Sequence, residues 1–165
     1  MLVEAVLGNL FAHGAAPDLD SIDWLDLTWD RCLRRAISKA TRGGRNVRIL
    51  LRLGSPVLRH GDVLLIAPDD PRTRIAINII ECELVVAQPR GLNDWTSLAY
   101  ELGDLHIPMR LEADRIISID DGPIVGVMDR LGIPYRTEVG RFEPTHGCSP
   151  PLVPVSDSFR MIRTA

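Results

Sequence analysis

Two segments of the same design follow one another in the second half of this chain, and they limit its fold more than any other feature. Apolar residues recur with the three- and four-residue spacing of one helix face over residues 95–102, and again over residues 124–131. Strand-like sequence flanks each segment, and a glycine follows each stripe, Gly103 and then Gly132. Strand, helix and strand repeated in this way are typical of the ferredoxin-like βαββαβ arrangement.

Local chemistry predicts where both helices begin and end. Asn93 is expected to cap the first helix and residues 120–121 the second, in which Pro123 suits the first turn. Gly103 and Gly132 are expected to take the left-handed conformation that closes many helices.

The first half of the chain has the pattern of short strands and turns. Apolar and polar residues alternate over residues 47–53, and the glycine pair at 43–44 suits a tight hairpin. We therefore expect an α+β chain in three parts: a small β domain over residues 1–73, a ferredoxin-like domain over residues 74–146, and a flexible, proline-rich C-terminal tail over residues 147–165.

Charge is distributed unevenly near the N-terminus. Residues 1–30 hold six acidic and no basic residues, whereas residues 31–52 hold eight basic and no acidic residues. We expect neighbouring strands to pair these opposite charges across a sheet. A nucleic-acid surface over residues 31–52 is the alternative, but the net charge of −3 and the 5% aromatic content argue against it.

The composition does not indicate a membrane or secreted protein. No apolar run approaches the ~20 residues of a membrane-spanning helix. The apolar start of the chain has no basic residue before Arg31, unlike a secretory signal. Three widely spaced cysteines do not suggest a disulfide framework, so the expected compartment is the cytoplasm.

Motifs of known enzyme classes are missing. The sequence has no nucleophile elbow, no phosphate-binding loop, no dinucleotide fingerprint and no Cys-x-x-Cys pair. We therefore expect a protein that is not an enzyme.

The histidines are the residues best suited to bind a metal ion. His13 and His60 lie beside glycines and are expected in solvated loops. His106 follows Gly103 and is expected to begin a strand, on its polar face. A solvent-facing histidine is the commoner outcome at such a position. A two-fold dimer axis, however, would bring two copies of one histidine together, and paired imidazoles suit nickel, copper or zinc.

The segment around His106 resembles a known family. Residues 98–109, Leu-Ala-Tyr-Glu-Leu-Gly-Asp-Leu-His-Ile-Pro-Met, are similar to the Gly-Asn-Arg-His-x-Pro signature of the UreE-type urease accessory proteins, with Asp-Leu in place of Asn-Arg. Residues 59–62 and 142–144 also match phrases of this family in the same order. The resemblance extends over about residues 1–146.

This resemblance implies a nickel metallochaperone. Its fold would be an N-terminal β domain that binds peptides or partners, followed by a ferredoxin-like domain through which two copies form a homodimer. His106 would meet its copy in the dimer mate and bind nickel there, with copper or zinc as substitutes in vitro. The ion would pass through the urease accessory GTPase to the urease maturation complex, without a nucleic-acid or membrane partner.

The C-terminal tail offers two further candidate ligands, His146 and Cys148, which the resemblance makes auxiliary nickel ligands. Because this tail is not rich in histidine, we expect delivery of nickel with low capacity rather than storage. The alternative is a non-metal interaction module of the urease maturation complex, in which the β domain binds a peptide and His106 is incidental. Replacement of His106 would separate the two hypotheses.

Overall fold

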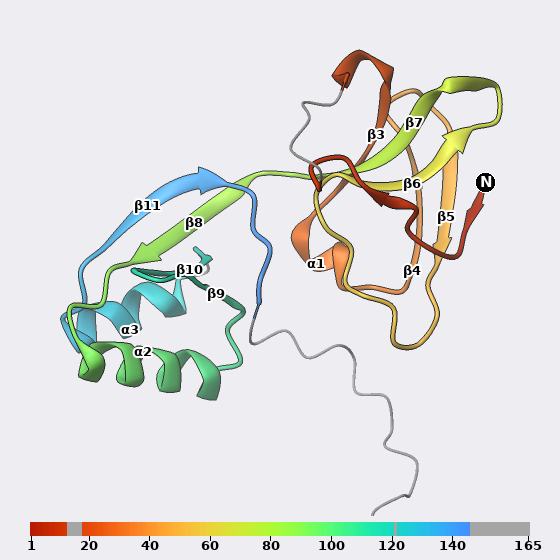
Figure 1. The fold of residues 1–165 in the computed structure, drawn as a ribbon. Helices are drawn as coiled ribbons and strands as arrows, with labels where there is room; N and C mark the ends of the chain where they lie inside the picture. Colours follow the sequence, from red (N-terminus) through yellow and green to blue (C-terminus); the bar gives the residue numbers. More distant parts are fainter. Residues whose placement is uncertain (13–17, 121, 146–165) are drawn as a thin grey trace, which may run out of the picture.

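The computed structural model describes residues 1–12, 18–120 and 122–145. They form two lobes side by side, joined where β7 (Asp70–Ile79) leads into β8 (Cys82–Ala87) (Figure 1). The predicted fold class is confirmed, with a β domain first and an α+β domain second. The expected tail lies outside the described residues. Within the described part of the chain, no helix is long and apolar enough to cross a membrane.

Two small sheets make the N-terminal lobe, with strand orders β1-β5-β4 and β2-β6-β7-β3. The strands are β1 (Leu2–Val3), β2 (Gly8–Asn9), β3 (Ile22–Leu27), β4 (Ala36–Ala40), β5 (Asn46–Leu50) and β6 (Asp62–Ala67). A 3₁₀ turn (Leu19–Ser21) precedes β3, and the short helix α1 (Trp29–Cys32) joins β3 to β4. The strand predicted over residues 47–53 is thus β5, which ends earlier, at Leu50.

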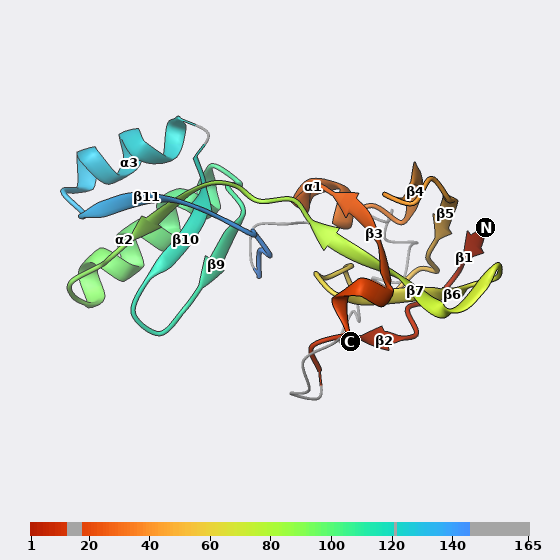
Figure 2. The ribbon, with the colours of Figure 1, turned by 90° about the horizontal axis from the view of Figure 1, so that it is seen from above.

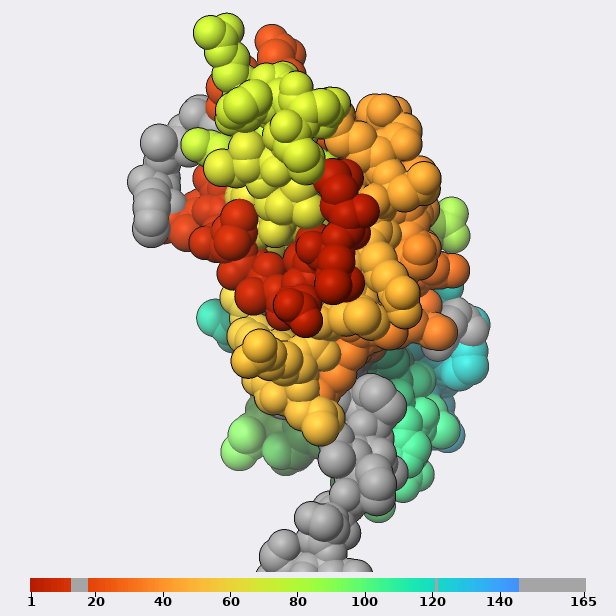
Figure 3. Space-filling view, turned by 90° about the vertical axis from the view of Figure 1, so that its right-hand side faces the viewer, coloured from red at the N-terminus to blue at the C-terminus, as the bar shows by residue number. Residues whose placement is uncertain are grey.

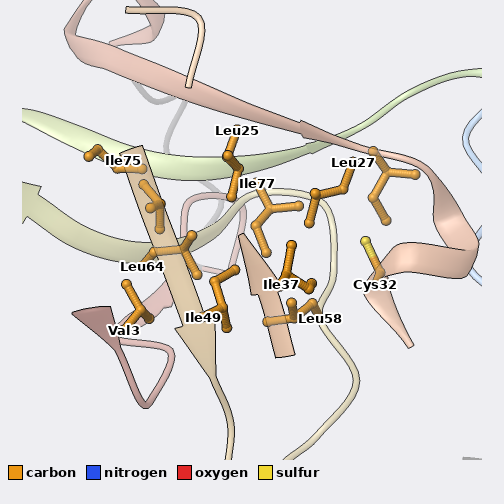
Figure 4. Packing of buried hydrophobic residues seen from close by; sticks show 12 residues of the cluster. Val3, Leu25, Leu27, Cys32, Ile37, Ile49, Leu58, Leu64, Ile75 and Ile77 are labelled. Carbon is orange, nitrogen blue, oxygen red and sulfur yellow. The ribbon is translucent and has the colours of Figure 1, made fainter. Parts of the chain in front are cut away.

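The two sheets of this lobe pack face to face around an apolar core. In β3, Leu25 and Leu27 are fully buried, whereas the side chain of Asp26 between them turns to the other face, as the two-residue period requires. Leu25 pairs in register with Ile77 of β7. Figure 4 shows these side chains pointing toward Ile37 and Ile49 of the other sheet. The core of this lobe is therefore built from strands of both sheets.

Opposite charges meet where the two sheets come together. Arg45 lies 2.8 Å from Asp23, and Arg42 lies 2.7 Å from Asp26. These pairs join β3 of one sheet to the loop between β4 and β5 of the other sheet. The expected pairing of acidic and basic segments is therefore present, but it connects two sheets rather than neighbouring strands of one sheet.

The Asp23 carboxylate is the buried centre of this network. It accepts hydrogen bonds from the Thr41 hydroxyl at 2.7 Å, from the Gly43 N–H at 2.8 Å and from the Arg45 guanidinium at 2.8 Å. A Cβ atom at Gly43 would lie 2.7 Å from Asp23 Oδ2, so this glycine is needed for space. Gly44 supplies the positive φ of the hairpin, at 82°.

The C-terminal lobe has the predicted ferredoxin-like arrangement. Its sheet has the order β11-β8-β10-β9 and is antiparallel throughout. Two helices cover one face of the sheet (Figures 1 and 2). The elements are α2 (Leu92–Asp104), β9 (Met109–Leu111), β10 (Ile116–Ile119), α3 (Pro123–Leu131) and β11 (Tyr135–Gly140).

Strand β8 is buried on both faces. Val85 belongs to the core under the two helices, whereas Leu84 and Val86 pack with Phe142 on the opposite face. This double burial explains why β8 has a continuous apolar run instead of an alternating pattern.

The helix starts differ from the prediction. The N-cap of α2 is Gly91 rather than Asn93, and the N-cap of α3 is Gly122 rather than residues 120–121. Gly122 has φ 83°, a left-handed turn that favours glycine over an acidic residue. Pro123 begins α3 as predicted.

Contacts around Phe142 join the two lobes. Its ring meets the ring of Trp29 edge to face, with centroids 5.3 Å apart. The Glu143 carboxylate accepts a hydrogen bond from the backbone N–H of His60 at 3.1 Å. The boundary expected between residues 73 and 74 falls inside β7, whose pairing with β3 continues to Ile79.

Replacement of Asp23 by Ala tests the charge network. We expect a loss of about 2–3 kcal/mol in the free energy of unfolding, because three donors lose their buried acceptor. Urea denaturation at pH 7 would measure this loss. The matched control is Asp69→Ala, which removes an exposed carboxylate from the same Arg45 guanidinium and should change stability little.

The pH dependence of this variant is a second readout. Burial alone would raise the pKa of Asp23, but its hydrogen bonds outweigh burial and hold the pKa below the usual value. A lowered folded-state pKa contributes stability above the unfolded pKa of about 3.9, and this contribution is lost as the pH falls through the folded value. Asp23→Ala should therefore lose less stability than the wild type between pH 5 and pH 3. An equal loss in both proteins would contradict this account.

Candidate metal site

His106 lies at the C-terminal end of α2, in the connection to β9. The N–H of Ile107 donates to the Leu102 carbonyl at 2.9 Å, and the N–H of His106 donates to the Gly103 carbonyl at 3.1 Å. Together these two bonds form a Schellman motif, which requires a left-handed residue at the position of His106. His106 has φ 55°, the only positive φ among the described residues other than glycine.

Helix α3 ends in the same motif, with glycine at the equivalent position. The N–H of Ile133 donates to the Met128 carbonyl at 3.0 Å, and the N–H of Gly132 donates to the Asp129 carbonyl at 3.2 Å. Gly132 has φ 65°, as predicted. A left-handed conformation costs an ordinary L-residue about 1–2 kcal/mol, so histidine stands where glycine would fit more easily. Such a residue points to a functional constraint.

Two expectations for this segment are wrong. Gly103 does not close α2; it lies inside the helix, and the left-handed turn comes three residues later. His106 does not begin a strand, because β9 starts at Met109. The reason is the apolar contact that accompanies a Schellman motif: Leu102 and Ile107 are both buried in the core under the helices, which sets the end of α2.

The imidazole of His106 is exposed on a partly apolar surface. The preceding Leu105 is 49% exposed, and Tyr100, on the last turns of α2, is 72% exposed. Leu111 at the end of β9 is also exposed. Exposed apolar residues on one lobe are typical of a surface that contacts another molecule.

The described part of a single copy offers few further metal ligands to join His106. Across the ranges 1–12, 18–120 and 122–145, no group of three or more His, Cys, Asp or Glu residues is arranged to hold a metal ion. Cys32 is buried, and burial, with smaller effects of nearby acids, raises the pKa of its thiol to about 12. This thiol is therefore unsuited to ligation near neutral pH.

The tail candidates His146 and Cys148 lie outside the described residues, as does His13. The chain leading to them can still be followed. The N–H of Thr145, the last described residue, donates to the Met109 carbonyl at 2.9 Å. Thr145 therefore lies beside the start of β9, and Met109 follows His106 by three residues in the sequence.

His60 is not the solvated loop residue that was expected. Its ring is stacked between Phe11 and Trp24, with centroid distances of 5.2 and 5.7 Å. Its Nδ1 accepts a hydrogen bond from the Ile79 N–H at 3.4 Å. Burial lowers the pKa of this imidazole, with a further contribution from Arg141. No local sequence signal indicated this environment, because every partner lies at least 19 residues away along the chain.

Separate substitutions at the two left-handed positions, His106 and Gly132, test the strain at His106. His106→Gly should raise the free energy of unfolding by up to about 1 kcal/mol, because glycine adopts the conformation freely. Gly132→Ala should lower it by about 1 kcal/mol at the equivalent position of α3. Urea denaturation of both variants measures these changes. A loss of stability in His106→Gly as large as that in Gly132→Ala would contradict the strain.

Comparisons with known proteins agree with this architecture. Residues 3–78 match the family model of the UreE urease accessory protein N-terminal domain, and residues 82–151 match that of its C-terminal domain. The urease accessory protein UreE of Lysinibacillus sphaericus is 30% identical over 143 residues, 87% of this chain and 93% of the relative. Its counterpart in Halalkalibacterium halodurans is 29% identical over 143 residues, 87% of this chain and 91% of that relative. One from Haemophilus influenzae is 30% identical over 140 residues, 83% of this chain and 74% of the relative. The chain therefore belongs to the UreE family of urease accessory proteins.

Proposed function

We propose that this chain is a metallochaperone that carries Ni(II) for assembly of the urease metallocentre, bound between the His106 side chains of two copies. The observation that carries the proposal is the strained position of His106, an exposed imidazole in a conformation that glycine takes in α3. The names of the relatives supply the connection with urease.

Coordination chemistry supports two copies. A square-planar nickel site needs about four donors, and a single imidazole supplies one. Two copies related by a two-fold axis supply a pair of imidazoles, because any residue near the axis meets its own copy. Water or mobile ligands complete such a site and leave it open, so the ion is exchanged more readily than from a closed cage of protein ligands.

Exposed apolar residues of the C-terminal lobe support the same dimer. Leu105, directly before His106, presents apolar area to solvent, as do Tyr100 and Leu111 of the same lobe, and a second copy would cover such area. The C-terminal lobe is thus the proposed dimerisation domain, and the N-terminal lobe is the proposed site for a partner or peptide.

His146 and Cys148 are the proposed auxiliary ligands. Thr145, directly before His146 in the sequence, is hydrogen-bonded to Met109, and Met109 begins the strand that follows His106. Thiolate and imidazole both bind divalent transition metals, and copper or zinc would compete with nickel in vitro.

The proposed partners are the urease accessory GTPase and the urease maturation complex. The proposed compartment is the cytoplasm, in accord with widely spaced cysteines of which Cys32 and Cys82 are free thiols. The proposed role is that of a carrier and not of an enzyme.

Nickel titration calorimetry on the wild type and His106→Gly tests this function. We expect about one ion per dimer in the wild type and at least tenfold weaker binding in His106→Gly, because each copy loses its imidazole. The variant keeps the preferred backbone conformation, so a loss cannot be attributed to misfolding of the α2 end. Binding should also weaken on mild acidification, because imidazole ligates in its neutral form.

The control variant is His60→Phe, which removes a histidine from the N-terminal lobe and keeps an aromatic ring between Phe11 and Trp24. It should bind nickel as the wild type does, and light scattering should find both variants dimeric. Unchanged binding in His106→Gly would move the site elsewhere. Failure of the wild type to bind nickel would leave the non-metal interaction module.

A further inference from the structure

The N-terminal lobe contains a groove that the nickel proposal does not use. Its volume is about 920 Å³, and it runs between the N-terminal segment 5–12 and the loop 51–60. Glu143, from the C-terminal lobe, also lines it. Figure 3 shows this side of the lobe, with the N-terminal segment in red against the yellow-orange loop.

The groove has apolar walls and hydrogen-bond donors. Phe11 and Val57 line it and are 45% and 48% exposed. Arg59 and His60 line it as well. Because His60 Nδ1 accepts the Ile79 N–H, the neutral ring carries its proton on Nε2, which makes Nε2–H the donor of this ring.

A second hollow lies next to this groove, at the end of the described chain. It has a volume of about 600 Å³ and is lined by Pro144 and Thr145. It shares Val57, Arg59 and Glu143 with the groove. A chain that continues from Thr145 therefore begins in a hollow that borders the groove.

The sequence after Thr145 includes an apolar, proline-rich segment of a kind that suits this groove. Residues 150–155 read Pro-Pro-Leu-Val-Pro-Val, and no charged residue occurs between Glu143 and Asp157. Proline-rich segments favour the extended polyproline II helix, whose carbonyls have no internal partners. Aromatic-lined grooves that also donate hydrogen bonds recognise such segments. The five residues from Thr145 to Pro150 span up to about 17 Å, enough to cross the second hollow.

We propose that residues 150–155 of this chain bind in the groove of its own N-terminal lobe. The segment is then an intramolecular competitor for any partner peptide that uses the groove. A short tether gives it a local concentration in the millimolar range, so it excludes weak ligands and yields to strong ones. This inference does not rest on nickel binding.

Competition with a labelled peptide tests the proposal. The probe is a fluorescent synthetic peptide with the sequence of residues 149–156, and fluorescence polarisation gives its affinity for full-length protein. Leu152→Asp places a charge in the proposed bound segment and should free the groove. We expect the peptide to bind Leu152→Asp about tenfold more tightly than the wild type, whose own segment competes.

Matched variants locate the binding site. Ser156→Asp adds the same charge just outside the segment and should behave as the wild type does. In the Leu152→Asp background, Val57→Asp should abolish peptide binding. Leu53→Asp should leave binding unchanged, because Leu53 is 72% exposed in the same loop but does not line the groove.

Three results would overturn the proposal. Equal peptide affinity in the wild type and Leu152→Asp would show that the groove is not occupied by its own chain. No binding to Leu152→Asp would show that the groove does not recognise this sequence. Binding that survives Val57→Asp would place the peptide elsewhere. Nickel titration of Leu152→Asp is a separate readout, because this variant keeps His106, His146 and Cys148.

Discussion

The ring of Phe142 is fully buried against Leu84, Val86 and Ile117, on the sheet face opposite the two helices, and its edge meets Trp29 of the other lobe. Strand β8 has apolar residues on both faces, so the sheet must be covered on both sides. One face is covered by α2 and α3, and the other by Phe142. The same contact fixes where the chain leaves the lobe, and it places Glu143 beside both the His60 backbone and the groove.

The repeated helix stripes were sufficient to predict the ferredoxin-like lobe, because burying two such helices on one sheet leaves few alternatives. Helix ends were harder to predict. Gly103 has the residue type of a left-handed cap, but the end of α2 is set by burial of Leu102 and Ile107 together. The burial of these two residues thus outweighed the preference of glycine for the left-handed conformation.

The candidate sites were predictable to the extent that their signals are local. His106 was found from a short segment of sequence, although its backbone conformation was not. The environment of His60 and the hydrogen bonds of Asp23 join residues from distant parts of the chain. Alternation along β3 indicates that Asp23 faces the core side, but only the fold brings Thr41 and Gly43 to it.

The Schellman motif at the end of α2 also limits how His106 can move. Two backbone hydrogen bonds and the buried Ile107 hold its main chain, so only the two side-chain torsions of the imidazole remain free. Rotamer changes of exposed side chains take picoseconds to nanoseconds, far faster than segmental motion. The ion that we propose for this imidazole could therefore be exchanged without any rearrangement of the helix, and the other proposed ligands would then set the rate of transfer.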